Sequence, residues 1–136
     1  MDLQPMTTTE TVTADRRWLK GIHGSGMNET VTLDVSKFTS GTHYVAATAT
    51  MPYAYFKSGI PLGKITASGL YGPYASGAAD GTQVLAGVLY TETAFNPAVT
   101  KVAGALMVHG SVDTAKLPVA LTVPAAASRT DNIRFS

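Results

Sequence analysis

The stretch Lys57–Tyr90, KSGIPLGKITASGLYGPYASGAADGTQVLAGVLY, decides the predicted fold. It is rich in glycine and proline turns, it carries little charge, and an Asp80-Gly81 pair precedes its apolar end. Asp-Gly between apolar runs predicts a tight β-turn, because both residues accept the backbone angles that a strand reversal needs. We therefore expect Val84–Thr91 to form the best core strand of a β-rich chain.

The sequence on either side of this stretch also has the patterns of short strands. Val31, Leu33 and Val35 alternate with polar residues, which predicts a strand with one buried face. The other segments expected to be strands are 42–50, 53–56 (as a short edge or extended piece), 64–67, 99–112, 117–123 and a last strand that contains Ile133 and Phe135.

The connections between these strands follow from turn residues. Glycine and proline pairs predict a loop over 69–79, and Asn96-Pro97 predicts a turn after the core strand. The alanines that follow Pro124 predict one or two helical turns, because proline suits the first turn of a helix and alanine has the best helix propensity. The predicted fold is therefore mainly β, with about one small helix.

Composition narrows the classes of function. The chain has 136 residues, the size of one domain, with 14% charged residues, a net charge of +1 and no cysteine. Lack of cysteine excludes disulfides, zinc-thiolate sites and a thiol nucleophile. The charge gives no basic stripe for nucleic acid, and no apolar run approaches the roughly 20 residues that span a membrane. So few charges favour a surface that is buried against partners.

The N-terminal region differs from the rest. Residues 1–30 are rich in threonine and end in a glycine cluster, so we expect an arm that is flexible when free, followed by a compact domain over 31–136. The β-branched run Thr7–Thr13 predicts a strand that forms when a partner supplies a sheet edge. Trp18, the one tryptophan, has two interpretations: a docking anchor, or a side chain that folds back onto its own core.

The chain offers little catalytic chemistry. Its three histidines have no second ligand at metal spacing, Gly24-Ser25-Gly26 lacks the third glycine and the lysine of phosphate loops, and no GxSxG motif occurs. We expect no enzyme activity, no metal and no cofactor. The aromatic residues Tyr71 and Tyr74 leave open a carbohydrate-binding surface, in which rings stack on sugars.

The order of the motifs resembles one protein family. GxPLGxxT, which contains Gly59, Pro61 and Gly63, is followed by GLYGPY, by Asp80-Gly81 and by AGVLY. Then come GALMVHGSV, Leu117-Pro118, an alanine stretch and the closing Ile133 and Phe135. This succession is similar to the small head decoration proteins of tailed bacteriophages, relatives of the lambda decoration protein. The resemblance covers roughly residues 31–135.

The resemblance implies a compact β-rich domain of barrel-like or β-tulip type and no catalysis. It implies homotrimers on the outer surface of the expanded phage head, at three-fold and quasi-three-fold positions, which bind the major capsid protein and help the head resist DNA pressure. Assembly would take place in the cytoplasm of the host bacterium. Neither nucleic acid nor membrane is an expected partner.

Two sets of residues carry these expectations. The residues expected to contact the capsid through the arm are Thr9, Thr11, Val12, Thr13, Trp18 and Leu19. The residues expected to shape turns are Gly59, Pro61, Gly63, Asp80 and Gly81. Two alternatives remain open: an adhesion or carbohydrate-binding module on a virion surface, and another virion component such as a tail-tube protein.

Overall fold

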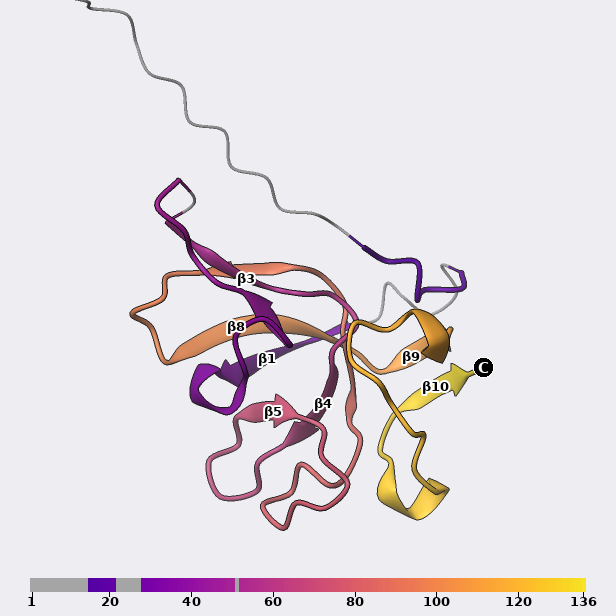
Figure 1. Ribbon diagram of the computed structural model, residues 1–136. Coiled ribbons are helices and arrows are strands. Elements are labelled where there is room, and N and C mark those ends of the chain that lie inside the picture. Colours follow the sequence, from indigo (N-terminus) through magenta and orange to yellow (C-terminus); the bar gives the residue numbers. More distant parts are fainter. Residues whose placement is uncertain (1–14, 22–27, 51) are drawn as a thin grey trace, which may run out of the picture.

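A closed five-stranded barrel forms the centre of the computed structural model, which describes residues 15–21, 28–50 and 52–136 (Figure 1). The barrel order is β1-β5-β4-β6-β8. Its strands are β1 (Asn28–Asp34), β4 (Pro61–Lys64), β5 (Tyr71–Pro73), β6 (Gly87–Leu89) and β8 (Lys101–Met107). The prediction of a mainly β, barrel-like chain is confirmed.

The longest pairing in the barrel joins β1 to β8. These strands are antiparallel over their whole length, from Asn28 opposite Met107 to Asp34 opposite Lys101. On the other side of β1, Leu33 pairs with Tyr71 in the one parallel contact of the barrel. Val31 and Leu33 are buried, as the alternating pattern predicted, because successive side chains of a strand point to opposite faces.

Two smaller sheets flank the barrel. The first has the order β2-β3-β7 and contains β2 (Tyr44–Val45), β3 (Ala54–Phe56) and β7 (Thr93–Phe95). The second pairs β9 (His109–Val112) with β10 (Asn132–Phe135) in parallel. The helices in the described ranges are three single 3₁₀ turns: η1 (Val35–Lys37), η2 (Thr114–Lys116) and η3 (Ala126–Ser128).

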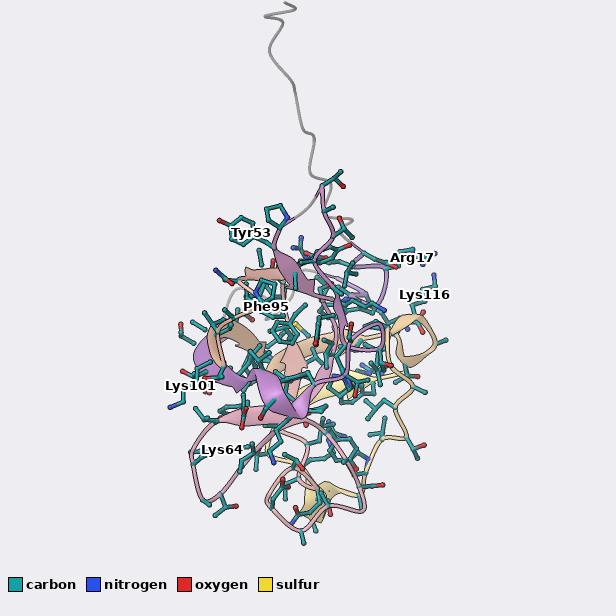
Figure 2. The ribbon with its side chains drawn as sticks, turned by 60° about the vertical axis from the view of Figure 1, so that its left-hand side comes forward. Arg17, Tyr53, Lys64, Phe95, Lys101 and Lys116 are labelled. Carbon is teal, nitrogen blue, oxygen red and sulfur yellow. The ribbon has the colours of Figure 1, made fainter. Side chains whose placement is uncertain are left out.

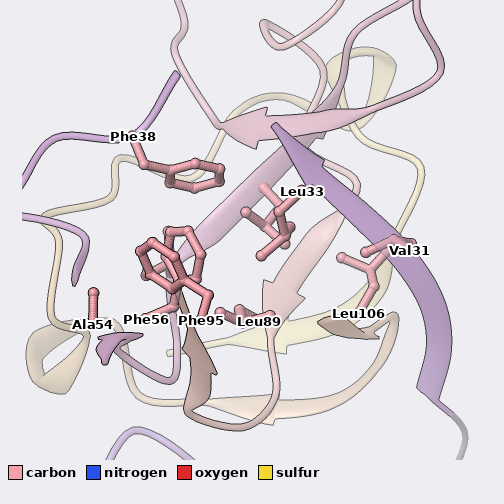
Figure 3. Packing of buried hydrophobic residues seen from close by; sticks show 10 residues of the cluster. Val31, Leu33, Phe38, Ala54, Phe56, Leu89, Phe95 and Leu106 are labelled. Carbon is pink, nitrogen blue, oxygen red and sulfur yellow. The ribbon is translucent and has the colours of Figure 1, made fainter. Parts of the chain in front are cut away.

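The core consists of two clusters. The first fills the barrel and extends under the β2-β3-β7 sheet, where Phe56 stacks on Phe95 with ring centroids 4.6 Å apart and Phe38 meets Phe56 edge-on (Figure 3). The second contains Trp18, Val88, Met107, Val112 and Ile133, and so joins the barrel to the β9-β10 sheet. The two clusters together bury strands that are each too short to be stable alone.

Several strand predictions were right in kind but not in extent. The core strand expected over 84–91 is the shorter β6, and the apolar run 99–112 forms the two strands β8 and β9. The run 42–50 contains only the two residues of β2. Two other predictions are confirmed: the alanine stretch forms one helical turn, η3, and Ile133 and Phe135 lie in the last strand, β10.

Other expectations were wrong. Residues 53–56 were expected at an edge, but β3 is the central strand of its sheet. The strand expected over 64–67 lies earlier, because Pro61 takes the first position of β4, where a missing N–H is tolerated. The expected loop 69–79 contains β5, which pairs with both β4 and β1. The strand expected over 117–123 is absent from the described sheets.

Candidate interaction surfaces

A short segment before the barrel fastens the N-terminal side of the chain to the body. We call residues 15–21 the strap. Leu19 forms a bridge with Val112 of β9, the Lys20 amide donates to the Ser111 carbonyl at 3.1 Å, and the Asp113 amide donates to the Trp18 carbonyl at 2.7 Å. The strap therefore adds a third extended segment to the β9-β10 sheet, on the side of β9 away from β10.

Trp18 gives the strap its apolar anchor. Its side chain is fully buried in the second cluster, and its Nε1 donates to Ser58 Oγ at 3.1 Å. Ser58 in turn donates to the Asp15 carbonyl at 2.7 Å. Gly59 lies under the indole, since a Cβ there would stand 2.7 Å from Trp18 Nε1. Of the two interpretations of Trp18, the structure has the one in which it folds back onto its own core.

The contacts of Trp18 and Leu19 with the body of the protein bear on the residues that were expected to form the N-terminal arm. Trp18 and Leu19 were expected to contact a capsid, but in the structure Trp18 is buried and Leu19 is half-buried against β9. The reason is that an indole offers the largest apolar surface in this region, and burial in the chain's own core removes it from water. Strand β1 also begins at Asn28, before the expected domain start at Val31. Thr9, Thr11, Val12 and Thr13 lie outside the described residues.

Charged residues hold the first residues of the strap. Arg16 forms an ion pair with Glu92 at 2.7 Å, and the Asp15 amide donates to the same carboxylate at 3.1 Å. Hydrogen bonds from Arg17 lower the pKa of Asp15, and the positive charge of Lys116 contributes a smaller effect in the same direction. Figure 2 shows Arg17 and Lys116 on the same side of the molecule, apart from Tyr53. The point at which residue 15 reaches the body is therefore fixed.

A groove of about 320 Å³ surrounds this point. Its lining residues come from the strap, from β2 and β3, from the segments that follow β3 and β6, and from the segment after η2; they are Asp15, Val45, Tyr55, Lys57, Ser58, Glu92 and Pro118. We call it the strap groove. Its lining combines the apolar residues Val45 and Pro118 with the charged residues Asp15, Lys57 and Glu92.

A second candidate surface is the hairpin over 44–56. Its sequence, YVAATATMPYAYF, contains no charged residue. Tyr53 is 50% exposed, and Ala46 and Pro52 are also exposed. At the base of the hairpin, the apolar residues Val35, Tyr44, Ala46, Ala47, Ala54, Phe95 and Pro97 line a groove of about 240 Å³. An uncharged projection with an exposed aromatic ring is typical of a surface that another molecule covers.

The glycine and proline motifs other than Gly59 lie around β4. Pro61 and Gly63 are in β4, and a Cβ on Gly63 would stand 2.6 Å from the Thr82 Cα. The Asp80 carbonyl accepts from the Thr66 amide, and Asp80 Oδ1 accepts from both the amide and the hydroxyl of Thr82. These hydrogen bonds lower the pKa of Asp80. Asp80-Gly81 therefore packs a loop against the end of β4 and does not join two paired strands directly.

Gly81 allows a test of this packing. Its φ is +112°, and a Cβ would collide with the Lys64 carbonyl, so Gly81→Ala is expected to destabilise the protein by more than about 1 kcal/mol in urea unfolding. Gly77→Ala is the matched control, because nothing lies within 4 Å of a Cβ there, and a change within about 0.5 kcal/mol is expected. Equal effects of the two substitutions would contradict the close contact.

Within the described residues, no group of three or more histidine, aspartate or glutamate side chains could hold a metal ion. Tyr71, a candidate for stacking on sugars, is half-buried in β5 against the first cluster, and its burial raises the pKa of its hydroxyl. In 15–21, 28–50 and 52–136 there is also no helix with the length and hydropathy to cross a membrane.

A polar cluster that no sequence motif indicated lies at the C-terminal strand. Arg129 and Asp131 form an ion pair at 2.6 Å, and the Asp131 side chain is fully buried. Arg129 also donates to the Ile133 carbonyl at 2.7 Å, and Asp131 accepts from the Ile133 amide at 3.0 Å. Their i, i+2 spacing in the sequence is too common to have indicated this arrangement.

The comparisons with known proteins identify the same family that the order of the sequence motifs resembles. A family model described as bacteriophage lambda head decoration protein D matches residues 26–133. No curated protein and no solved structure gives a significant match. The matched range begins just before β1 and ends within β10, so it includes the whole barrel.

Proposed function

The chain belongs to the family of bacteriophage lambda head decoration protein D, and from this premise we propose that it binds the outside of the expanded head as a homotrimer. In this proposal the trimers occupy three-fold and quasi-three-fold positions, contact the major capsid protein and stabilise the head against the pressure of its DNA. The observation that carries the proposal is the family match over residues 26–133. A protein that binds only the expanded lattice shifts the equilibrium towards that lattice.

The strap supports a role for the residues that precede it. Because residue 15 is fixed by Glu92 and Ser58, the 14 residues before it start from a defined point on the body. A threonine-rich segment at such a point suits addition to an exposed sheet edge of the capsid protein, which needs backbone hydrogen bonds and few specific side chains. In a trimer three such segments act together, so each contact can be weak while the whole binds tightly.

The uncharged hairpin supports a second contact. Burial of Tyr53 and its apolar neighbours against another subunit or the capsid would remove an exposed apolar surface from water. A protein that sediments as a monomer at high concentration and also lies as a monomer in images of the decorated head would contradict the trimer.

Removal of residues 1–14 tests the contribution of the arm. The strap and both core clusters stay intact, so we expect an unchanged unfolding midpoint but at least a tenfold weaker binding to expanded heads in a co-sedimentation assay. A deletion up to residue 30 is unsuitable, because it would also remove Trp18 and the start of β1.

Two variants that keep the full length of the chain separate the loss of the arm's backbone hydrogen bonds from the shortening of the chain. Replacement of Thr9, Thr11 and Thr13 by proline removes backbone donors and is expected to weaken binding as the deletion does. Replacement of the same residues by valine retains β propensity and is expected to keep binding. If the deletion saturates heads like the full chain, the arm makes no contribution.

A further inference from the structure

One end of the barrel carries a groove that the proposed function does not use. At this end β1, β5 and β6 begin, and β4 and β8 end. Two hollows, of about 390 Å³ and about 260 Å³, lie here. Tyr71, Ala86 and Thr130 line both of them, so the hollows adjoin, and we call them together the mouth groove. Small-molecule sites often lie in the mouths of β-barrels and have volumes of roughly 300–1,000 Å³.

The floor of the mouth groove is apolar and contains an aromatic ring. Leu106 is buried, and Ala86 and Val108 are half-buried and pack against the first core cluster. Tyr71 packs against the same cluster from the first position of β5. It is only half-buried and lines both hollows, so part of its side chain is open to the groove. A ring held in this way offers a rigid apolar surface to a ligand.

The walls of the groove offer both donors and acceptors of hydrogen bonds. Gln83 Oε1 accepts from the Gly81 amide at 2.8 Å, which leaves the Nε2 group of this side chain to donate. Burial raises the pKa of the Tyr71 hydroxyl, and the negative charge of Glu29 adds to this effect, so the carboxylate lies near that hydroxyl. The other polar side chains of the lining have no hydrogen-bond partner among the described residues; they are Lys64, Thr66, Thr130 and Asn132.

The charges and the closed barrel narrow the class of ligand. Glu29 lines one hollow and Lys64 lines the other, so the groove lacks the excess of one charge that attracts a polyanion or a polycation. An extended peptide binds along an open strand edge, and a closed barrel has no such edge. A neutral sugar chain fits both conditions. Its rings have C–H faces that pack on an aromatic ring, and its hydroxyls donate and accept hydrogen bonds.

We propose that the mouth groove binds a neutral saccharide, with one pyranose ring packed on Tyr71 and its hydroxyls hydrogen-bonded to the walls. Gln83 Nε2 donates to the sugar, and the Glu29 carboxylate accepts from it. This inference goes beyond capsid decoration and does not depend on it. On a head that carries many copies, a weak site of this kind would act many times over and hold the particle to a surface rich in neutral glycans.

Titration of the isotope-labelled full chain with oligosaccharides, followed by NMR, tests the proposal. The neutral probes are maltohexaose, cellohexaose and mannohexaose, and the acidic probe is a heparin hexasaccharide. We expect at least one neutral probe to bind with a dissociation constant on the order of 1 mM and to shift amides of residues 64–66, 71, 81–86 and 106–108. No shift with any neutral probe, shifts confined to other residues, or tighter binding of the heparin hexasaccharide would each overturn the proposal.

Two variants test the residues of the groove. Tyr71→Leu keeps an apolar side chain against the first cluster but loses the ring, and Thr130→Arg fills the part that both hollows share. Each is expected to weaken binding of the neutral probe at least fivefold. Thr42→Arg is the matched control, because Thr42 is exposed before β2 and outside the groove, and binding like that of the native chain is expected.

The unfolding midpoint of each variant reports whether it folds. If Tyr71→Leu does not fold, Thr130→Arg decides alone, because residue 130 is exposed and Tyr71 stays in place. Binding by a folded Thr130→Arg that equals binding by Thr42→Arg would overturn the proposal.

Discussion

Replacement of Trp18 by alanine is expected to lower the free energy of unfolding by about 3–5 kcal/mol, because it removes a fully buried aromatic side chain and leaves a cavity. The cavity would lie between the barrel and the β9-β10 sheet, where Trp18 contacts the second cluster. It would also leave the buried Ser58 hydroxyl without its donor. Urea unfolding followed by circular dichroism measures the loss, since the variant has no tryptophan for fluorescence.

Two control substitutions separate the anchor from the rest of the strap. Trp18→Phe retains an aromatic ring but loses the hydrogen bond to Ser58, so a smaller loss is expected. Lys20→Ala removes an exposed contact between Nζ and Ser136 Oγ and is expected to change stability by less than about 0.5 kcal/mol. A loss of less than about 1 kcal/mol for Trp18→Ala would show that the strap is not part of the folded core.

The second large effect is expected for Arg129→Met. The substitution leaves the buried Asp131 carboxylate without its cation, which is expected to cost about 3 kcal/mol. It also removes the donor to the Ile133 carbonyl and the guanidinium that lies 4.9 Å from the centroid of the Phe135 ring. Because β10 depends on these contacts, thermal and urea unfolding are both expected to shift towards lower stability.

The double variant Arg129→Met, Asp131→Leu tests the cause. If the loss comes from an unpaired buried charge, removal of that charge is expected to recover part of the stability, so that the double variant is more stable than Arg129→Met alone. Arg17→Met is the matched surface control, since its ion pair with Asp15 is exposed and is expected to matter little. Losses that simply add in the double variant would contradict this explanation.

The sequence predicted those features that depend on local pattern. Alternation at Val31 and Leu33, the Val84–Thr91 run and the residues around Ile133 gave strands at the right places, because burial of one face imposes a period of two. The order of the turn motifs predicted the family of head decoration protein D, and the family model matches residues 26–133. These features depend only on residues that are close to one another in the sequence.

Features that depend on distant contacts were not predictable. Pro61 and Pro73 have the pattern of turn residues, yet Pro61 begins β4 and Pro73 ends β5. These two short strands form because β4 pairs with β5 and β6, and β5 also pairs with β1. The two interpretations of Trp18 could not be separated, since the choice depends on Ser58 and Gly59, about 40 residues away in the sequence. In 117–123 the pattern of a strand is present, but a pattern does not show whether a partner strand exists.

The strap also has a consequence for the order of events during synthesis. Its partners Val112, Asp113 and Ser136 lie near the other end of the chain, so contacts of this kind raise the contact order and form late. On the ribosome, residues 15–21 have nowhere to dock until β9 has been translated. Residues 15–21 can therefore dock fully only on a chain in which β9 is complete.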